Sequence, residues 1–226
     1  MWQYEVASQG FSTLERVLDP AEINELLEQL ESRPLVRGRA GARNGLTHSA
    51  IRSAALDSRL LGIARQVLGD TAQPFRATLF DKSPSANWLV AWHQDTLLPL
   101  RERRHVTGWG PWSLKAGIHY ARATSDALSR VIALRLFLDD SSVLNGPLRV
   151  LPGTHTLGVL ETSQVEQLGA RLRARECPGH RGAVLVMRPL LVHSSSKSKV
   201  VSSRRVLHLE YAESLHPVEG LELAVA

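Results

Sequence analysis

The chain has a single cysteine, few aromatic residues and no long apolar run. Because Cys177 has no second cysteine to pair with, no disulfide can form within the chain, which suits a reducing cytoplasm. The opening residues, MWQYEV, lack the basic and then apolar segments of a secretory signal. The most apolar segment, residues 182–192, contains Arg188 and is far too short to cross a bilayer. These absences predict a soluble cytoplasmic protein with no membrane partner.

The sequence also lacks internal repeats and any linker that would divide it. Its 226 residues, 43% hydrophobic and 22% charged, are ordinary for one globular domain. We therefore expect a single domain over residues 1–226. Its N-terminal part, at about 13–70, should be helical, and its core, at about 74–212, should be built of β-strands.

Positive charge exceeds negative charge by five, and nearly all of the positive charge is arginine. Arginines cluster at residues 101–104 and 171–175. These clusters are either solvated faces of a loop and a helix or a sign of an anionic substrate, such as a carboxylate or an acyl-CoA. No aromatic residues alternate with the arginines, which argues against a nucleic-acid partner.

Helix signals are concentrated in the first third of the chain. The stretch Asp19-Pro20-Ala21-Glu22 supplies an N-cap, a proline at the first helical position and an acidic third residue. A second helix is expected from Ser58 to Leu68, ended by Gly69. Residues 37–45, with three glycines, are expected to form a loop.

From residue 74 onward the pattern changes to short strands. We expect strands at 75–82, 88–93, 114–120, 131–139, 182–187, 190–195 and 204–212, and a helix at 163–174. Arg135 lies in the middle of an apolar strand, so it needs an anionic partner or a wet cavity, and we interpret it as lining a cavity. The fold is predicted to be mostly β with flanking helices, two facing sheets forming a jelly-roll core.

One strand-forming stretch, residues 87–95, ends in side chains that can hold a metal ion. His93 and Asp95 are two positions apart and therefore point to the same side of an extended strand. His193, after another run of strand-forming residues, is the candidate third ligand. Two histidines and one carboxylate that leave open coordination positions are typical of non-haem Fe(II) oxygenases. Taken alone, the His-x-Asp pair would favour a solvated strand end over a metal site.

Further motifs follow in order. Residues 145–155 read NGPLRVLPGTH, and Arg204 lies eleven residues beyond His193. With the His-x-Asp pair, this order resembles the phytanoyl-CoA dioxygenase family of iron- and 2-oxoglutarate-dependent oxygenases, over about residues 75–211. The resemblance implies a double-stranded β-helix, or cupin-like jelly-roll, core.

The resemblance also implies a cofactor, a cosubstrate and their ligands. Fe(II) would be held by His93, Asp95 and His193, with 2-oxoglutarate as cosubstrate and O2 as oxidant. Arg204 would bind the far carboxylate of 2-oxoglutarate, because a guanidinium matches a carboxylate fork to fork. Arg205 should point outward on the alternating strand. The other candidates for cosubstrate contact are Ser195, Arg135 and Thr78.

Four residues are weaker candidates for substrate contact: Trp109, Trp112, Arg43 and Lys115. The two tryptophans, within residues 99–112, are either packing anchors or a wall of the pocket. The expected reaction is hydroxylation of a small organic molecule, with release of succinate and CO2. The alternative is a non-catalytic jelly roll that binds a metabolite or a metal. The sequence specifies neither the substrate nor the oligomeric state.

Overall fold

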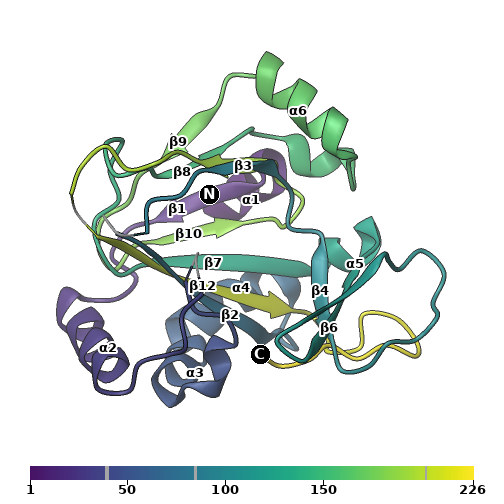
Figure 1. Ribbon diagram of the computed structural model, residues 1–226, viewed down its shortest axis with the longest axis horizontal. Coiled ribbons are helices and arrows are strands. Elements are labelled where there is room, and N and C mark those ends of the chain that lie inside the picture. The colour runs from purple at the N-terminus through teal and green to yellow at the C-terminus, as the bar shows by residue number, and fades with distance from the viewer. Residues whose placement is uncertain (39–40, 84–85, 202) are drawn as a thin grey trace.

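Two antiparallel β-sheets face each other, and helices cover the outer side of the larger one (Figure 1). The computed structural model describes residues 1–38, 41–83, 86–201 and 203–226. The larger sheet has the strand order β1-β10-β7-β12-β2, the smaller one has β3-β11-β8-β9, and a third sheet at one end has β4-β6-β5.

The strands are β1 (Phe11–Leu14), β2 (Gln73–Lys82), β3 (Val90–His93), β4 (Leu97–Leu100), β5 (Trp112–Lys115), β6 (Ile118–Arg122), β7 (Val131–Phe137), β8 (Leu148–Val150), β9 (Arg175–Cys177), β10 (Val184–Met187), β11 (His193–Ser195) and β12 (Arg204–Ala212). The helices are α1 (Trp2–Gln9), α2 (Pro20–Ser32), α3 (Ser49–Ala55), α4 (Ser58–Leu68), α5 (Ser125–Ser129) and α6 (Thr162–Arg171), with 3-10 turns at Gly45–Thr47 and Thr154–Leu157. No described helix is both long enough and apolar enough to span a bilayer.

The outer face of the larger sheet is covered by α2, α3 and α4 (Figure 1). Ile23 of α2, Ile51 of α3 and Leu60 of α4 lie in one buried cluster with Leu134 and Leu136 of β7. This contact uses the even-numbered side chains of β7, because successive strand residues point to opposite faces. The odd-numbered side chains of β7 therefore point between the two sheets.

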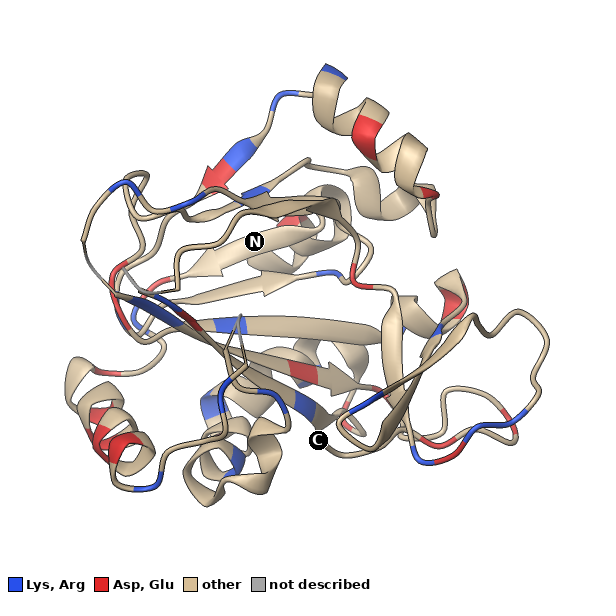
Figure 2. Cartoon of the chain, in the orientation of Figure 1, with Lys and Arg blue, Asp and Glu red and all other residues tan. Residues whose placement is uncertain are grey.

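The space between the sheets is apolar at one end and polar at the other. Phe137 of β7, Leu185 of β10 and Val150 of β8 share a buried cluster that joins the two sheets. Figure 2 shows basic positions on β2, β7 and β12 in the middle of the molecule, in addition to those on exposed loops. The apolar end holds the sandwich together, and the polar end contains the candidate site.

Most predicted elements are confirmed. The helix at 58–68 and the strand at 204–212 have the expected bounds, and the capping box of α2 forms between Asp19 and Glu22. The strand expected at 114–120 is wrong: the chain turns at Ala116 and Gly117 and makes the hairpin β5–β6. Ala116 adopts a positive φ of 49°, which is uncommon for a residue with a side chain, so the turn had no strong sequence signal.

The packing of α6 on β3 allows a test with two glycines. An added Cβ on Gly169 would lie 2.4 Å from the Trp92 ring, whereas one on Gly62 in α4 would meet nothing within 4 Å. Gly62→Ala is expected to stabilise the protein by about 0.5–1 kcal/mol through helix propensity. Gly169→Ala is expected to destabilise it by about 1–3 kcal/mol, because overpacking outweighs that gain. Urea unfolding of both variants measures the difference, and a Gly169→Ala protein as stable as the wild type would contradict this packing.

Candidate active site

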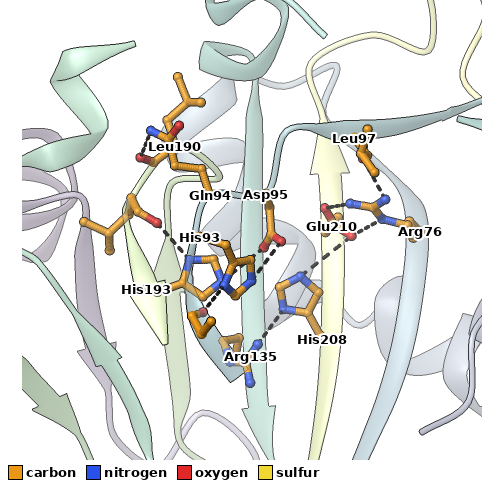
Figure 3. A network of polar contacts seen from close by, with 12 residues as sticks. Arg76, His93, Gln94, Asp95, Leu97, Arg135, Leu190, His193, His208 and Glu210 are labelled. Atoms are coloured by element: carbon orange, nitrogen blue, oxygen red, sulfur yellow. Dashed lines mark hydrogen bonds and ion pairs between the residues drawn. The ribbon is translucent and has the colours of Figure 1, made fainter. Parts of the chain in front are cut away.

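The three candidate metal ligands converge at the polar end of the sandwich (Figure 3). His93 at the end of β3 and His193 at the start of β11 are direct partners in the register, with ring centroids 4.1 Å apart. Asp95 follows two residues after His93, and its carboxylate oxygens lie 3.7 Å from His93 Nε2 and 3.5 Å from His193 Nε2. One ligand atom from each residue lies within 4.8 Å of the others.

Backbone contacts fix which nitrogen of each ring faces the centre. His93 Nδ1 lies 2.9 Å from the Ala91 carbonyl, and His193 Nδ1 lies 2.8 Å from the Leu191 carbonyl. Because a carbonyl oxygen can only accept, each Nδ1 carries the hydrogen and each Nε2 is the nitrogen that faces the centre. Burial lowers the pKa of His193 to about 4, so its ring is neutral near pH 7. Nε2 of both rings and the Asp95 carboxylate therefore face one another, a donor set that fits a divalent cation.

Polar side chains from β2, β7 and β12 lie beside this cluster because of the way these strands are aligned. They form the polar floor of the site. On β12, Arg204, His208 and Glu210 share the face that looks between the sheets. They lie opposite Lys82, Thr78 and Arg76 of β2, respectively, and His208 also lies opposite Arg135 of β7. Side chains far apart in the sequence thus form a polar row, interrupted by the apolar pair Val206 and Phe80 between Arg204 and His208.

Three cations gather at one end of this row. Lys82, Arg204 and Arg135 are only 1%, 5% and 7% exposed. Lys82 Nζ donates to Ser195 Oγ at 2.8 Å and to the Ser196 carbonyl at 2.5 Å. Arg204 Nε is buried and has no hydrogen-bond partner among the described residues.

No carboxylate among the described residues pairs with this cation cluster. Burial and the nearby Arg135 lower the pKa of Arg204 to about 10, so Arg204 stays charged near pH 7. Burial and the same two arginines lower the pKa of Lys82 to about 8. Uncompensated buried charge is costly, so the cluster fits a bound anion such as the far carboxylate of 2-oxoglutarate.

A second group of charges in the row is already satisfied. Arg76 pairs with Glu210 through Nε and Nη2 and donates through Nη1 to the Leu97 carbonyl at 2.9 Å (Figure 3). His208 lies between Glu210, at 3.7 Å from Nε2, and Arg135, whose Nη1 is 3.2 Å from Nδ1. This network gives the floor beside Asp95 a fixed geometry.

A cavity of about 430 Å³ joins the ligand cluster, the cation cluster and the satisfied pairs. This volume lies in the range of small-molecule sites. Its lining includes every residue expected to bind the metal or the cosubstrate, and also two residues expected at the substrate, Arg43 and Lys115. It also includes four residues that no sequence motif singled out, Arg76, Lys82, His208 and Glu210. Their only sequence signal was polar residues at every second position of otherwise apolar strands.

Comparison with known proteins was decisive for the family. The sequence profile described as "Phytanoyl-CoA dioxygenase (PhyH)" matches residues 6–206. The chain belongs to the phytanoyl-CoA dioxygenase family. The predicted family assignment is therefore confirmed.

The chain is also similar to a curated relative and to solved structures. L-proline trans-4-hydroxylase from Streptomyces griseoviridis is 25% identical over 180 residues, which are 67% of this chain and 59% of that protein. The chain thus spans about 59% of the length of this curated relative. EctD from S. alaskensis with 2-oxoglutarate and 5-hydroxyectoine superposes with a TM-score of 0.70 at 19% identity, covering 93% of this chain and 74% of EctD.

The carbocyclase SnoK from nogalamycin biosynthesis superposes with a TM-score of 0.71 at 18% identity, covering 99% of this chain and 95% of SnoK. At this level of identity the two solved structures show a shared fold. The predicted mostly β, jelly-roll fold is confirmed.

The family motif at residues 145–155 makes hydrogen bonds to the segment that carries His193. Thr154 Oγ1 donates to the Leu151 carbonyl and accepts from the Val192 backbone N–H at 3.0 Å, which fixes the chain just before His193. The Gly146 carbonyl accepts from Ser195 Oγ at 3.1 Å, and Gly146 has a φ of 70° and no room for a Cβ, which would lie 2.4 Å from the Ser196 carbonyl. The motif thus positions β11, which carries both His193 and Ser195.

The two tryptophans expected near substrate lie outside the cavity lining. Trp109 is buried in a separate cluster with Leu98 and Leu100, and Trp112 packs against that cluster. Their large apolar surfaces pack in the cluster beneath the third sheet. Their positions are those of packing anchors and not of a wall of the cavity. Arg205 points outward as expected and pairs with Asp139 at 2.9 Å.

Proposed function

We propose that this protein is an Fe(II)- and 2-oxoglutarate-dependent dioxygenase that hydroxylates a small organic molecule and releases succinate and CO2. The single observation that carries the proposal is the pairing of two features in one cavity. Three metal donors converge at one place, and the buried Arg204 guanidinium, whose Nε has no partner among the described residues, lies beside them. A dicarboxylate bound to a metal would satisfy both.

The proposed roles follow from position. His93, Asp95 and His193 hold Fe(II), and Arg204 binds the far carboxylate of 2-oxoglutarate. Lys82, held by Ser195, adds a second positive charge there, and Thr78 and Arg135 complete this part of the wall. When bound, Fe(II) with 2-oxoglutarate and O2 supplies the oxidising power to place one oxygen atom on a substrate C–H bond. The chain supplies orientation, shielding from water and fixed charges.

The proposal extends to the substrate, the domain organisation and the cellular location of the protein. The substrate is a small molecule that fits the cavity, and the excess of cations in the lining favours an anionic one. Residues 1–226 are proposed to form a single domain, supported by the buried cluster that joins α4 to β7. The cytoplasm is the proposed location, supported by the single buried thiol, Cys177.

The test measures 2-oxoglutarate binding and consumption by the purified chain. Calorimetry with redox-silent Mn(II) is expected to show 2-oxoglutarate binding that is lost when the metal is chelated. With Fe(II) and O2, slow succinate formation is expected even without substrate, and chelation should abolish it. Binding without any succinate would support the non-catalytic alternative. Absence of metal-dependent binding would overturn the proposal.

A further inference from the structure

We infer that the substrate is a small carboxylate-bearing anion, held between Arg43 and Lys115 at the open end of the cavity, and that it carries no ammonium group. This inference rests on the proposed function and names the substrate class for the same site. It is carried by the charges of the cavity and by which of them are already paired.

Arg43 and Lys115 reach the cavity from two fixed segments. Arg43 follows Ala42, whose backbone exchanges two hydrogen bonds with Leu79 of β2 at 2.8 and 2.9 Å. Lys115 ends β5, and its Nζ lies 5.3 Å from the centroid of the buried Tyr120 ring on β6. Both residues are exposed and both line the cavity, so they stand where solvent meets it.

The described lining contains six cationic residues and two carboxylates. The buried cluster of Lys82, Arg135 and Arg204 matches a dicarboxylic cosubstrate, and Arg76 is taken by Glu210. Arg43 and Lys115 remain, and neither has a carboxylate partner among the described residues. Burial and the charge of Arg43 lower the pKa of Lys115, which indicates that the two cations repel each other. An anion between them would be attracted to both and would offset this repulsion.

The carboxylates decide against an ammonium group on the substrate. Asp95 belongs to the metal donors, and Glu210 is paired with Arg76 and adjacent to His208. No other acid lines the described part of the cavity, so a substrate ammonium would be desolvated among cations with no counter-ion. This chain is therefore expected to prefer plain carboxylates over zwitterions such as L-proline.

The experiment uses the full chain loaded with Mn(II) and 2-oxoglutarate. The probes are small carboxylic acids, each matched with its methyl ester, together with N-acetyl-L-proline and L-proline. Calorimetry is expected to show that acids bind better than esters and that N-acetyl-L-proline binds better than L-proline. Succinate formation with Fe(II) should be stimulated in the same order.

Variants locate the subsite. Arg43→Gln and Lys115→Gln are each expected to raise the Kd of the acids about 10-fold, and the double variant about 100-fold, because each removes one charge-assisted hydrogen bond. Arg103→Gln, which removes an exposed arginine outside the cavity lining, is the matched control and should bind them like the wild type.

The inference is overturned if esters or zwitterions bind as well as acids, if no acid in the set binds at millimolar concentration, or if the double variant binds acids like the wild type. Failure of the proposed function has a different signature, because wild-type protein would then show no metal-dependent binding of 2-oxoglutarate.

Discussion

His193→Ala is expected to weaken metal binding and to lower succinate formation, each by more than about 100-fold. His193 Nε2 is one of three converging donors, and its ring is held by the Leu191 carbonyl at 2.8 Å. Loss of groups that only orient a metal ligand costs about 10- to 100-fold in metal affinity, so loss of a ligand should exceed that range. Calorimetric titration with Mn(II) and a succinate assay with Fe(II) measure the two effects.

The matched control is His155→Ala, which removes another family-motif histidine. His155 Nε2 also contacts a backbone carbonyl, that of Ala7 at 3.1 Å, but the residue lies outside the cavity lining. The control is expected to lose some stability, whereas its metal affinity should stay at the wild-type level. If His193→Ala bound Mn(II) as tightly as His155→Ala, the assignment of the three ligands would be untenable.

The metal cluster could be predicted from the sequence because part of its geometry is local. His93 and Asp95 share a strand face by simple alternation, which needs no tertiary information. His193 is a hundred residues away, and its place came from motif order; the structure shows the physical basis, a direct pairing of His93 with His193 across β3 and β11. Arg204 and Arg205 were separated by the same alternation, one facing inward and the other facing Asp139.

The rest of the site depends on how neighbouring strands are aligned in the sheet. That alignment cannot be read from local sequence patterns. Lys82 lies beside Arg204, and Arg76 beside Glu210, only because β2 and β12 pair in one particular alignment. A shift of β2 by one residue would turn Lys82 and Arg76 to the other face of the sheet, away from Arg204 and Glu210. The N-terminal α1 and β1 were missed for another reason: β1 has four residues and is recognisable as a strand only through its pairing with β10.

Lys82 and Arg204 in the cation cluster differ in how they can bind a carboxylate. Lys82 Nζ is a point charge already hydrogen-bonded to Ser195 Oγ and the Ser196 carbonyl. Arg204 has a planar fork, with Nε buried and unpartnered among the described residues. A guanidinium can bind both oxygens of a carboxylate at once, whereas an ammonium cannot reproduce that geometry. Arg204 should therefore contribute most of the affinity for 2-oxoglutarate, and Lys82 a smaller electrostatic part.

Arg204→Leu is accordingly expected to raise the Kd of 2-oxoglutarate, measured by calorimetry with Mn(II), by about 100- to 10,000-fold. Two charge-assisted hydrogen bonds are lost, each contributing about 1.5–3 kcal/mol, and each 1.4 kcal/mol corresponds to a factor of about ten. Arg204→Lys keeps the charge without the fork, so its Kd should rise only about 10-fold.

Arg205→Leu is the matched control, because it removes the neighbouring guanidinium on the same strand. Arg205 faces away from the cavity and pairs with Asp139, so its loss should lower stability while the Kd of 2-oxoglutarate stays unchanged. Metal affinity without 2-oxoglutarate should match the wild type in both leucine variants, since neither arginine is a metal donor. Equal Kd values for Arg204→Leu and Arg205→Leu would mean that the buried fork does not hold the cosubstrate, and the cation cluster would then need a different anion.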